Sequence, residues 1–159
     1  MHIHLICVGK LKEKYFKDAC AEYCKRLSRF AKIKVTELAD ETIPERASEA
    51  EETAVLQKEG EKILSVLGAN EALIALCVEG KQMSSVQLAK NMADCALSGK
   101  SSLAFAIGGS LGLSEDVKKR SFLRLSFSEM TFPHQLMRVV LLEQIYRSFK
   151  INAGESYHK

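Results

Sequence analysis

The sequence predicts an α/β domain built on a largely parallel sheet. Segments of strand and helix character alternate along the chain, and parallel strands need a crossover that a helix supplies. Two short runs, Ala72–Val78 and Ser102–Ile107, are continuously apolar, which is typical of strands buried on both faces. The length of 159 residues suits one domain, so we expect residues 1–159 to form a single unit.

The first half of the chain is expected to hold two strands and two helices. His2–Val8 is apolar and partly β-branched, which predicts a strand, and Ile33–Leu38 predicts a second. Between Glu13 and Phe30 apolar residues recur at helical spacing. An acidic helix is expected from Pro44 to about Leu67, and Gly60 inside it weakens its helix propensity.

The second half continues the same alternation. Ser84 stands three residues before Gln87, the spacing of a capping box, and Ser114 precedes two acids at the start of a short helix. The expected elements are the strands Ala72–Val78, Ser102–Ile107 and Phe122–Phe127, and the helices from Ser84 to near Gly99, from Ser114, and from His134 to Ile151.

Composition excludes several classes of protein. Hydrophobic residues make up 47%, too many for a disordered chain, and no apolar run approaches the roughly 20 residues that span a bilayer. The start of the chain lacks the basic region and cleavage site of a signal peptide. The five cysteines contain no C-x-x-C pair; Cys20 and Cys24 could hold a metal, but reduced apolar thiols in a cytoplasmic protein are the better interpretation. We therefore expect no membrane segment and no metal site.

Charge is distributed unevenly, although the net charge is only +3. Residues 9–34 hold nine Lys/Arg against three acids, residues 37–62 hold three against nine, and residues 118–159 hold eight against three. Two basic ends could together form a site for a polyanion. Solvated helix faces would give the same pattern.

The expected last helix is apolar around more than one face. A helix that buries one face needs an apolar arc of only about 100°. The apolar positions of this helix are wider than such an arc: Leu136, Met137, Val139, Val140, Leu141, Leu142, Ile145, Tyr146 and Phe149. A second subunit in a homodimer is the simplest partner for the second face, and a central helix in a monomer is the alternative.

A glycine-rich loop, Gly108 to Gly112, follows the fourth strand. Ligands of open parallel sheets bind beyond the carboxyl ends of the strands, so the loops after Val78, Ile107 and Phe127 are the expected binding region. The loop lacks the G-x-G-x-x-G order, and the next strand lacks the acid of a dinucleotide site. With the apolar and polar residues of Ser128–Pro133, it suits a flat purine with a thioether or sulfonium tail better than a row of phosphates.

Several long motifs point to a known family. "AIGGSLGLSEDV", "LSFSEMTFPHQLMRVVLLEQIYRSFKI" and the terminal "YHK" together resemble the RlmH family of ribosomal RNA methyltransferases, in the SPOUT class. "VGKLKEKYFKDACAEYCKRL", "EGEKIL" and "LCVEGKQMSS" extend the resemblance over essentially the whole chain.

The resemblance implies an α/β fold with a deep trefoil knot in the C-terminal half, working as a homodimer. It implies S-adenosylmethionine as methyl donor, and methylation at N3 of a pseudouridine in the large-subunit (23S) ribosomal RNA of the assembled ribosome. Carried over residue by residue, the cofactor contacts fall at Leu76, Gly108, Phe127, Ser128, Glu129, Met130, Thr131 and Phe132.

The resemblance assigns Arg138, Tyr157, His158 and Lys159 to RNA binding or catalysis. His158 is a candidate general base for the N3 proton, and Arg138 could stabilise the developing imide anion. Tyr157 could stack on a base and Lys159 could meet a phosphate. A tail that completes the partner subunit's site is a further expectation. His134 is expected to cap or pack, and His2 and His4 to lie at a sheet edge.

Two other functions remain open at this stage. The α/β pattern and the glycine loop would also suit a dinucleotide-dependent reductase, although the missing ribose-binding acid argues against it. The basic ends would suit a ribosome-binding module without catalytic activity.

Overall fold

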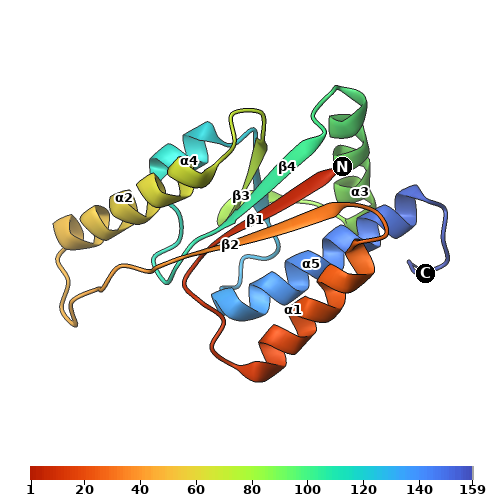
Figure 1. The fold of residues 1–159 in the computed structure, drawn as a ribbon. Helices are drawn as coiled ribbons and strands as arrows, with labels where there is room; N and C mark the ends of the chain where they lie inside the picture. Colours follow the sequence, from red (N-terminus) through yellow and green to blue (C-terminus); the bar gives the residue numbers. More distant parts are fainter. Residues whose placement is uncertain (159) are drawn as a thin grey trace.

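A five-stranded, all-parallel sheet with strand order β2-β1-β4-β3-β5 forms the centre of the computed structural model, which describes residues 1–158 (Figure 1). The strands are β1 (His2–Val8), β2 (Lys32–Leu38), β3 (Ala72–Gln82), β4 (Ser102–Ile107) and β5 (Leu123–Ser126). The helices are α1 (Lys14–Leu27), α2 (Glu49–Val66), α3 (Ser85–Leu97), α4 (Glu115–Arg120) and α5 (His134–Asn152). The α/β class and the parallel sheet are confirmed.

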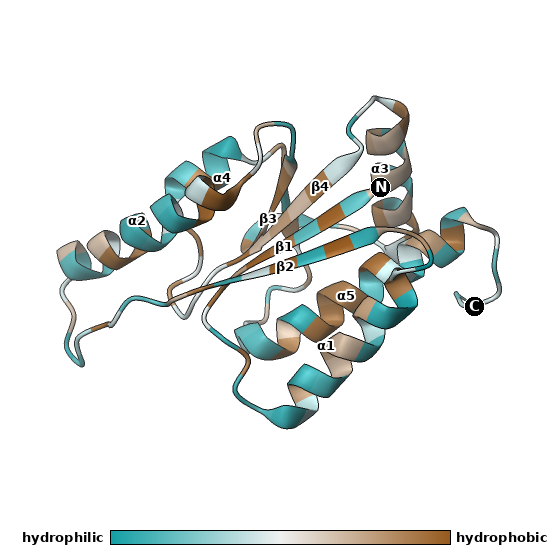
Figure 2. Ribbon diagram, viewed as in Figure 1, coloured by the Kyte–Doolittle hydropathy of each residue, from teal (hydrophilic) through white to brown (hydrophobic). Residues whose placement is uncertain are grey.

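Helices cover both faces of this sheet. Alternate residues of β1 point to opposite faces, so Ile3 and Leu5 pack under α1, α3 and α5, whereas Ile6 and Val8 pack under α2 and α4. Figure 2 shows hydrophobic residues concentrated in the central strands and along α5, with hydrophilic stretches on α1 and α2. Every residue from His134 to Ile151 is buried or half-buried within the single chain.

The wide apolar surface of α5 therefore has partners inside the chain. α5 lies between α1 and α3 and also faces the sheet. Tyr146 packs edge-on against Phe30, and Phe149 stacks on the same ring. This burial gives much of the apolar surface partners within the chain, while Leu136, Val139, Val140 and Phe149 remain half-buried.

The α2 helix begins later than expected. It starts at Glu49 rather than Pro44, because Ser48 and Glu51 form a reciprocal capping box that the sequence analysis missed. The expected box at Ser84 and Gln87 is confirmed. Gly60 is explained by close packing of α2 on α4, since a Cβ there would lie 2.1 Å from Ser114 Oγ.

Two further expectations differ from the structure. β3 continues past Val78 to Gln82 because, beyond a register shift, it pairs again with β5. His4 is not an edge residue: β1 is an interior strand, and the buried His4 ring bonds Glu71 at 3.0 Å and Thr36 Oγ1 at 2.8 Å. Burial raises the Glu71 pKa, but the hydrogen bonds from His4 and a backbone N–H outweigh it and lower the pKa below its ordinary value.

Candidate functional site

A cavity of about 300 Å³ lies at the carboxyl edge of the sheet, between the loops that follow β4 and β5 and the stretch of β3 from Leu76 to Glu79, where the pairing with β5 shifts register. This is where ligands bind in open parallel sheets. Of the eight residues expected to contact a cofactor, seven line the cavity: Leu76, Gly108, Phe127, Ser128, Met130, Thr131 and Phe132. Glu129 stands in the same loop but is not among the lining residues. Two of the three expected loops, after Ile107 and Phe127, thus border one space, whereas its third side is the middle of β3, because this strand continues past Val78 to Gln82.

The glycine loop after β4 folds tightly on itself. A Cβ at Gly108 would lie 2.2 Å from the carbonyl oxygen of Gly112, so no side chain fits there. The N–H of Gly112 donates to the carbonyl oxygen of Gly109 at 3.1 Å, and Gly112 has a φ of +86° that favours glycine. The loop presents backbone rather than side chains to the cavity at this point.

The loop after β5 is fixed by short-range hydrogen bonds. Ser126 Oγ donates to the Ser128 carbonyl oxygen at 3.1 Å, and the Met130 N–H donates to Ser128 Oγ at 3.0 Å. This arrangement leaves Met130 74% and Phe132 39% exposed, although both line the cavity. Two exposed apolar side chains at one opening mark a surface that a flat apolar group can cover.

The cavity is close to electrically neutral. Its charged lining residues within the described chain are Glu79 and Lys118, and these pair with each other. Lys118 also pairs with Glu115 at 3.1 Å. His134 lines the same cavity, and burial together with the nearby Arg138 charge lowers its pKa. A cavity without free cations does not attract several phosphates.

Arg138 is buried in α5, one turn after His134. Only 1% of the residue is exposed, and its guanidinium donates to Glu37 at 2.7 Å and to the carbonyl oxygen of Gly9. The Arg138 Nε has no hydrogen-bond partner. Burial raises the Glu37 pKa, but hydrogen bonds from Arg138 and the Leu11 N–H lower it overall. Arg138 joins α5 to the carboxyl ends of β1 and β2 and does not line the cavity.

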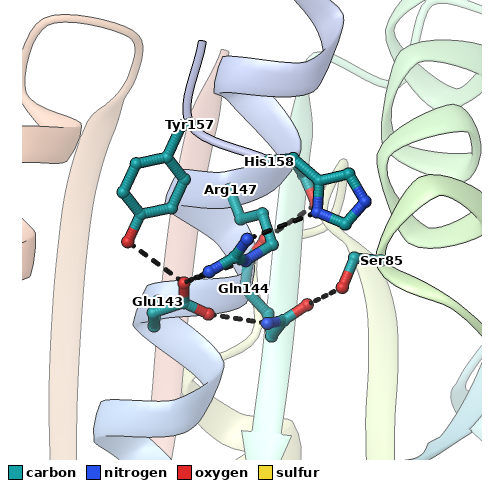
Figure 3. A network of polar contacts seen from close by, with 7 residues as sticks. Ser85, Glu143, Gln144, Arg147, Tyr157 and His158 are labelled. Carbon is teal, nitrogen blue, oxygen red and sulfur yellow. Dashed lines mark hydrogen bonds and ion pairs between the residues drawn. The ribbon is translucent and has the colours of Figure 1, made fainter.

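The C-terminal tail docks on the far half of α5 (Figure 3). The Tyr157 hydroxyl donates to Glu143 at 3.1 Å, and Arg147 lies 4.7 Å from the centre of the Tyr157 ring. His158 Nδ1 lies 3.3 Å from an Arg147 nitrogen. Burial and the neighbouring Glu143 carboxylate raise the Tyr157 pKa to about 12.

The cavity lies at the first turn of α5, whereas the tail docks from the middle of the helix onward. His134 and Met137, in the first turn, line the cavity, whereas Glu143 and Arg147 lie about 9 to 15 Å further along the helix at about 1.5 Å per residue. The structure therefore does not bring Tyr157 and His158 to the cavity of their own chain. Lys159 lies outside the described residues.

A second cavity, also of about 300 Å³, lies beside the first and was not expected from the sequence. It lies between the ends of β1 and β2, the glycine loop and α2, and it contains the buried Glu59. Asp40 and Glu41, which directly follow the second strand at the carboxyl edge, were the signal that could have indicated it.

Two absences hold for residues 1–158. No group of three or more His, Cys, Asp or Glu side chains is placed to hold a metal ion. No helix of this part of the chain is long and apolar enough to cross a membrane.

The parallel sheet, with a glycine-lined and nearly neutral cavity at its carboxyl edge, defines an α/β protein with a candidate site for a small ligand. The chain belongs to the SPOUT methyltransferase family, since the family model described as "Predicted SPOUT methyltransferase" matches residues 1–158.

Curated relatives are similar over their full length. Proteins named "Ribosomal RNA large subunit methyltransferase H" from Clostridium novyi (strain NT) and Bacillus cytotoxicus are each 59% identical over 159 residues, covering 100% of both chains. A protein of the same name from Bifidobacterium animalis subsp. lactis is 57% identical over the same length.

A solved structure shares the fold. A probable methylase family protein from Haemophilus influenzae Rd KW20 matches 99% of this chain and 70% of its own, with a TM-score of 0.56 and 11% identity.

Proposed function

We propose that the protein is an S-adenosylmethionine-dependent methyltransferase that modifies N3 of a pseudouridine in 23S ribosomal RNA of the assembled ribosome. The full-length similarity to relatives named as large-subunit ribosomal RNA methyltransferases supports the RNA substrate. The observation that carries the enzymatic role is the loop-built cavity at the carboxyl edge, which gathers seven of the eight expected cofactor contacts. We place this activity in the cytoplasm, with the chain as a homodimer that contains the trefoil knot of its family.

The residues present fit S-adenosylmethionine. The purine is flat and suits the exposed Met130 and Phe132, and the near-neutral lining suits a ligand without phosphates. Gly108 lets backbone approach the ligand where a Cβ would not fit. When bound, the cofactor supplies an electrophilic methyl group on a sulfonium.

The chain must position the base and remove the N3 proton. Holding the reactants in line lowers the activation barrier by several kcal/mol. The N3 imide nitrogen keeps its proton near neutral pH, so a base must remove it. We assign removal of the N3 proton to His158 and stabilisation of the developing imide anion to Arg138. Tyr157 contacts the base, and Lys159 contacts a phosphate. Arg138 reaches that anion only if it leaves Glu37, its partner in this structure.

The position of the tail favours a site shared by two subunits. Tyr157 and His158 dock far from the cavity of their own chain, so the tail of a partner is the simplest source of these groups. Mixing a subunit truncated before Tyr157 with a Gly108→Val subunit tests this. We expect the heterodimer to regain activity in one of its two sites, and no recovery would show that each site uses its own tail.

Titration with candidate cofactors distinguishes the proposed methyltransferase from a dinucleotide-dependent reductase. S-adenosylmethionine or S-adenosylhomocysteine should raise the melting temperature, and NAD(P)H should not. β5 is followed directly by Phe127 and Ser128, so no acid stands at its end for a ribose hydroxyl, and Glu129 further along the loop does not line the cavity.

Transfer of labelled methyl groups to ribosomes from a strain that lacks the endogenous enzyme tests the function directly. We expect label in the large-subunit RNA, at one pseudouridine. Ribosome binding without labelling would support a non-catalytic ribosome-binding module and contradict the enzyme.

A further inference from the structure

The second cavity lies directly beside the first and shares three residues with it. Gly109, Ser110 and His134 line both, so only the glycine loop and one imidazole separate them. A group held in the second cavity would therefore adjoin a ligand in the first. About 300 Å³ is at the small end of ligand sites, which suits a single pyrimidine ring.

The polar side chains of this second cavity are mainly hydrogen-bond acceptors. Asp40, Glu41 and Glu59 line it, and no lysine or arginine is among its described lining residues. Glu41 is already paired with Lys62 at 2.7 Å, and the Lys62 ammonium group also donates to the carbonyl oxygen of Ala39 at 2.8 Å. Such a lining repels phosphates and carboxylates and favours a neutral ring that carries N–H donors.

Glu59 is the residue that lacks a partner. It is 4% exposed, its Oε1 accepts from the Glu41 N–H at 3.0 Å, and its Oε2 has no hydrogen bond. A Cβ at Gly109 would lie 3.2 Å from Oε2, so the glycine makes room for this carboxylate against the loop that the two cavities share. Burial raises the Glu59 pKa. A buried carboxylate in this state gains from any donor that a ligand brings.

The base of pseudouridine offers a second N–H donor besides N3–H, and the base of uridine does not. The ring of pseudouridine is attached through carbon, so N1 keeps a hydrogen where uridine has a C–H. N1 and N3 are separated by C2 and point in different directions. N3 can therefore face the methyl donor while N1–H faces an acceptor in the second cavity.

We propose that the second cavity receives the target base and that Glu59 accepts a hydrogen bond from its N1–H, an inference that rests on the proposed function. Glu59 is then the residue that distinguishes pseudouridine from uridine. The carboxylate of the cofactor's methionine end fits less well, because it would meet three acidic side chains. A site built to bond an N–H discriminates against the analogue that lacks it, because its acceptor is left unpaired.

The test compares two ribosome substrates and three proteins. The substrates carry pseudouridine or, from a strain lacking the responsible synthase, uridine at the target position. The proteins are the wild type, Glu59→Gln, and the control Glu61→Gln, which removes the same charge from an exposed position of α2. Methyl transfer, S-adenosylhomocysteine affinity and melting temperature are measured for each.

We expect Glu59→Gln to lose about 10- to 100-fold in kcat/KM on pseudouridine, with no matching loss on uridine. Its S-adenosylhomocysteine affinity should stay within about twofold of the wild type, and Glu61→Gln should behave as the wild type in every assay. If Glu59→Gln does not fold, Glu59→Asp takes its place, because it keeps the charge but moves the carboxylate away from the base. It should show a smaller fall in kcat/KM on pseudouridine relative to uridine.

Three results would overturn the proposal. An unchanged preference for pseudouridine in folded Glu59 variants removes Glu59 from recognition. A selective loss of S-adenosylhomocysteine affinity means that the second cavity holds the cofactor's amino-acid end. A wild-type protein that methylates neither substrate refutes the proposed function, and this inference with it.

Discussion

Replacing Gly108 with alanine tests whether the glycine loop is a wall of the cofactor site. The added Cβ would lie 2.2 Å from the Gly112 carbonyl oxygen and 2.4 Å from the Gly112 carbonyl carbon, against an ordinary contact of at least 3.4 Å. Both atoms belong to the backbone, so no side chain can rotate away. The loop must therefore open by more than about 1 Å, which also strains the hydrogen bond between Gly112 and Gly109.

The expected effect is larger on binding than on folding. Misplacing a ligand-contacting loop by about 1 Å costs about 10- to 100-fold in affinity, or about 1.4 to 2.8 kcal/mol. Overpacking costs about 1 to 3 kcal/mol of folding free energy, which a domain with about 5 to 15 kcal/mol tolerates. Titration calorimetry with S-adenosylhomocysteine and urea unfolding measure the two quantities on the same Gly108→Ala sample.

Gly68→Ala is the matched control. It is the same substitution outside both cavities, and its Cβ meets a side chain, that of Glu71 at 3.2 Å, rather than backbone. The control should bind S-adenosylhomocysteine as the wild type does. A folded Gly108→Ala protein with wild-type affinity would refute the reasoning and leave the loop as a turn.

Three further predictions concern stability. Arg138→Met should lower the free energy of unfolding by about 3 kcal/mol, because it leaves Glu37 without its partner; urea unfolding that shows no loss would contradict this. Folding lowers the Glu71 pKa, so Glu71 stabilises the folded state above about pH 4.5, and this stabilisation is lost as the pH falls through the lower folded pKa. Glu71→Gln should therefore make the urea midpoint fall less steeply with acid pH, and an unchanged dependence would contradict this prediction. Gly60→Ala should lower stability by about 1 to 3 kcal/mol through contact with Ser114, and Ser114→Gly should restore part of the loss; a second mutation without effect would place the strain elsewhere.

Local patterns were sufficient for most of the fold. The capping box of Ser84 and Gln87 and the apolar run Ala72–Val78 act over a few residues, so the sequence displays them directly. Pro44 was misleading, because proline suits the first turn of a helix but the Ser48 capping box supplies the actual start.

Features that depend on distant partners could not be predicted. Arg138 reaches Glu37 across 101 positions, and the unpaired Glu59 becomes unusual only once it is buried. The loops after β4 and β5 were expected to border one site because the carboxyl ends of parallel strands meet at one edge, whereas the continuation of β3 to Gln82 depends on its second pairing with β5. The docking of Tyr157 far from that edge depends on Glu143 and Arg147, which no short-range pattern connects to the tail.

Amide hydrogen exchange with and without S-adenosylhomocysteine tests most directly whether the cavity at the carboxyl edge is the cofactor site. We predict protection of residues 108–113 and 127–132 and of the backbone after Leu76, which together line the cavity. Residues 40–43 of the second cavity should exchange at an unchanged rate. Protection confined to residues 40–43, or no protection under saturating ligand, would contradict the account.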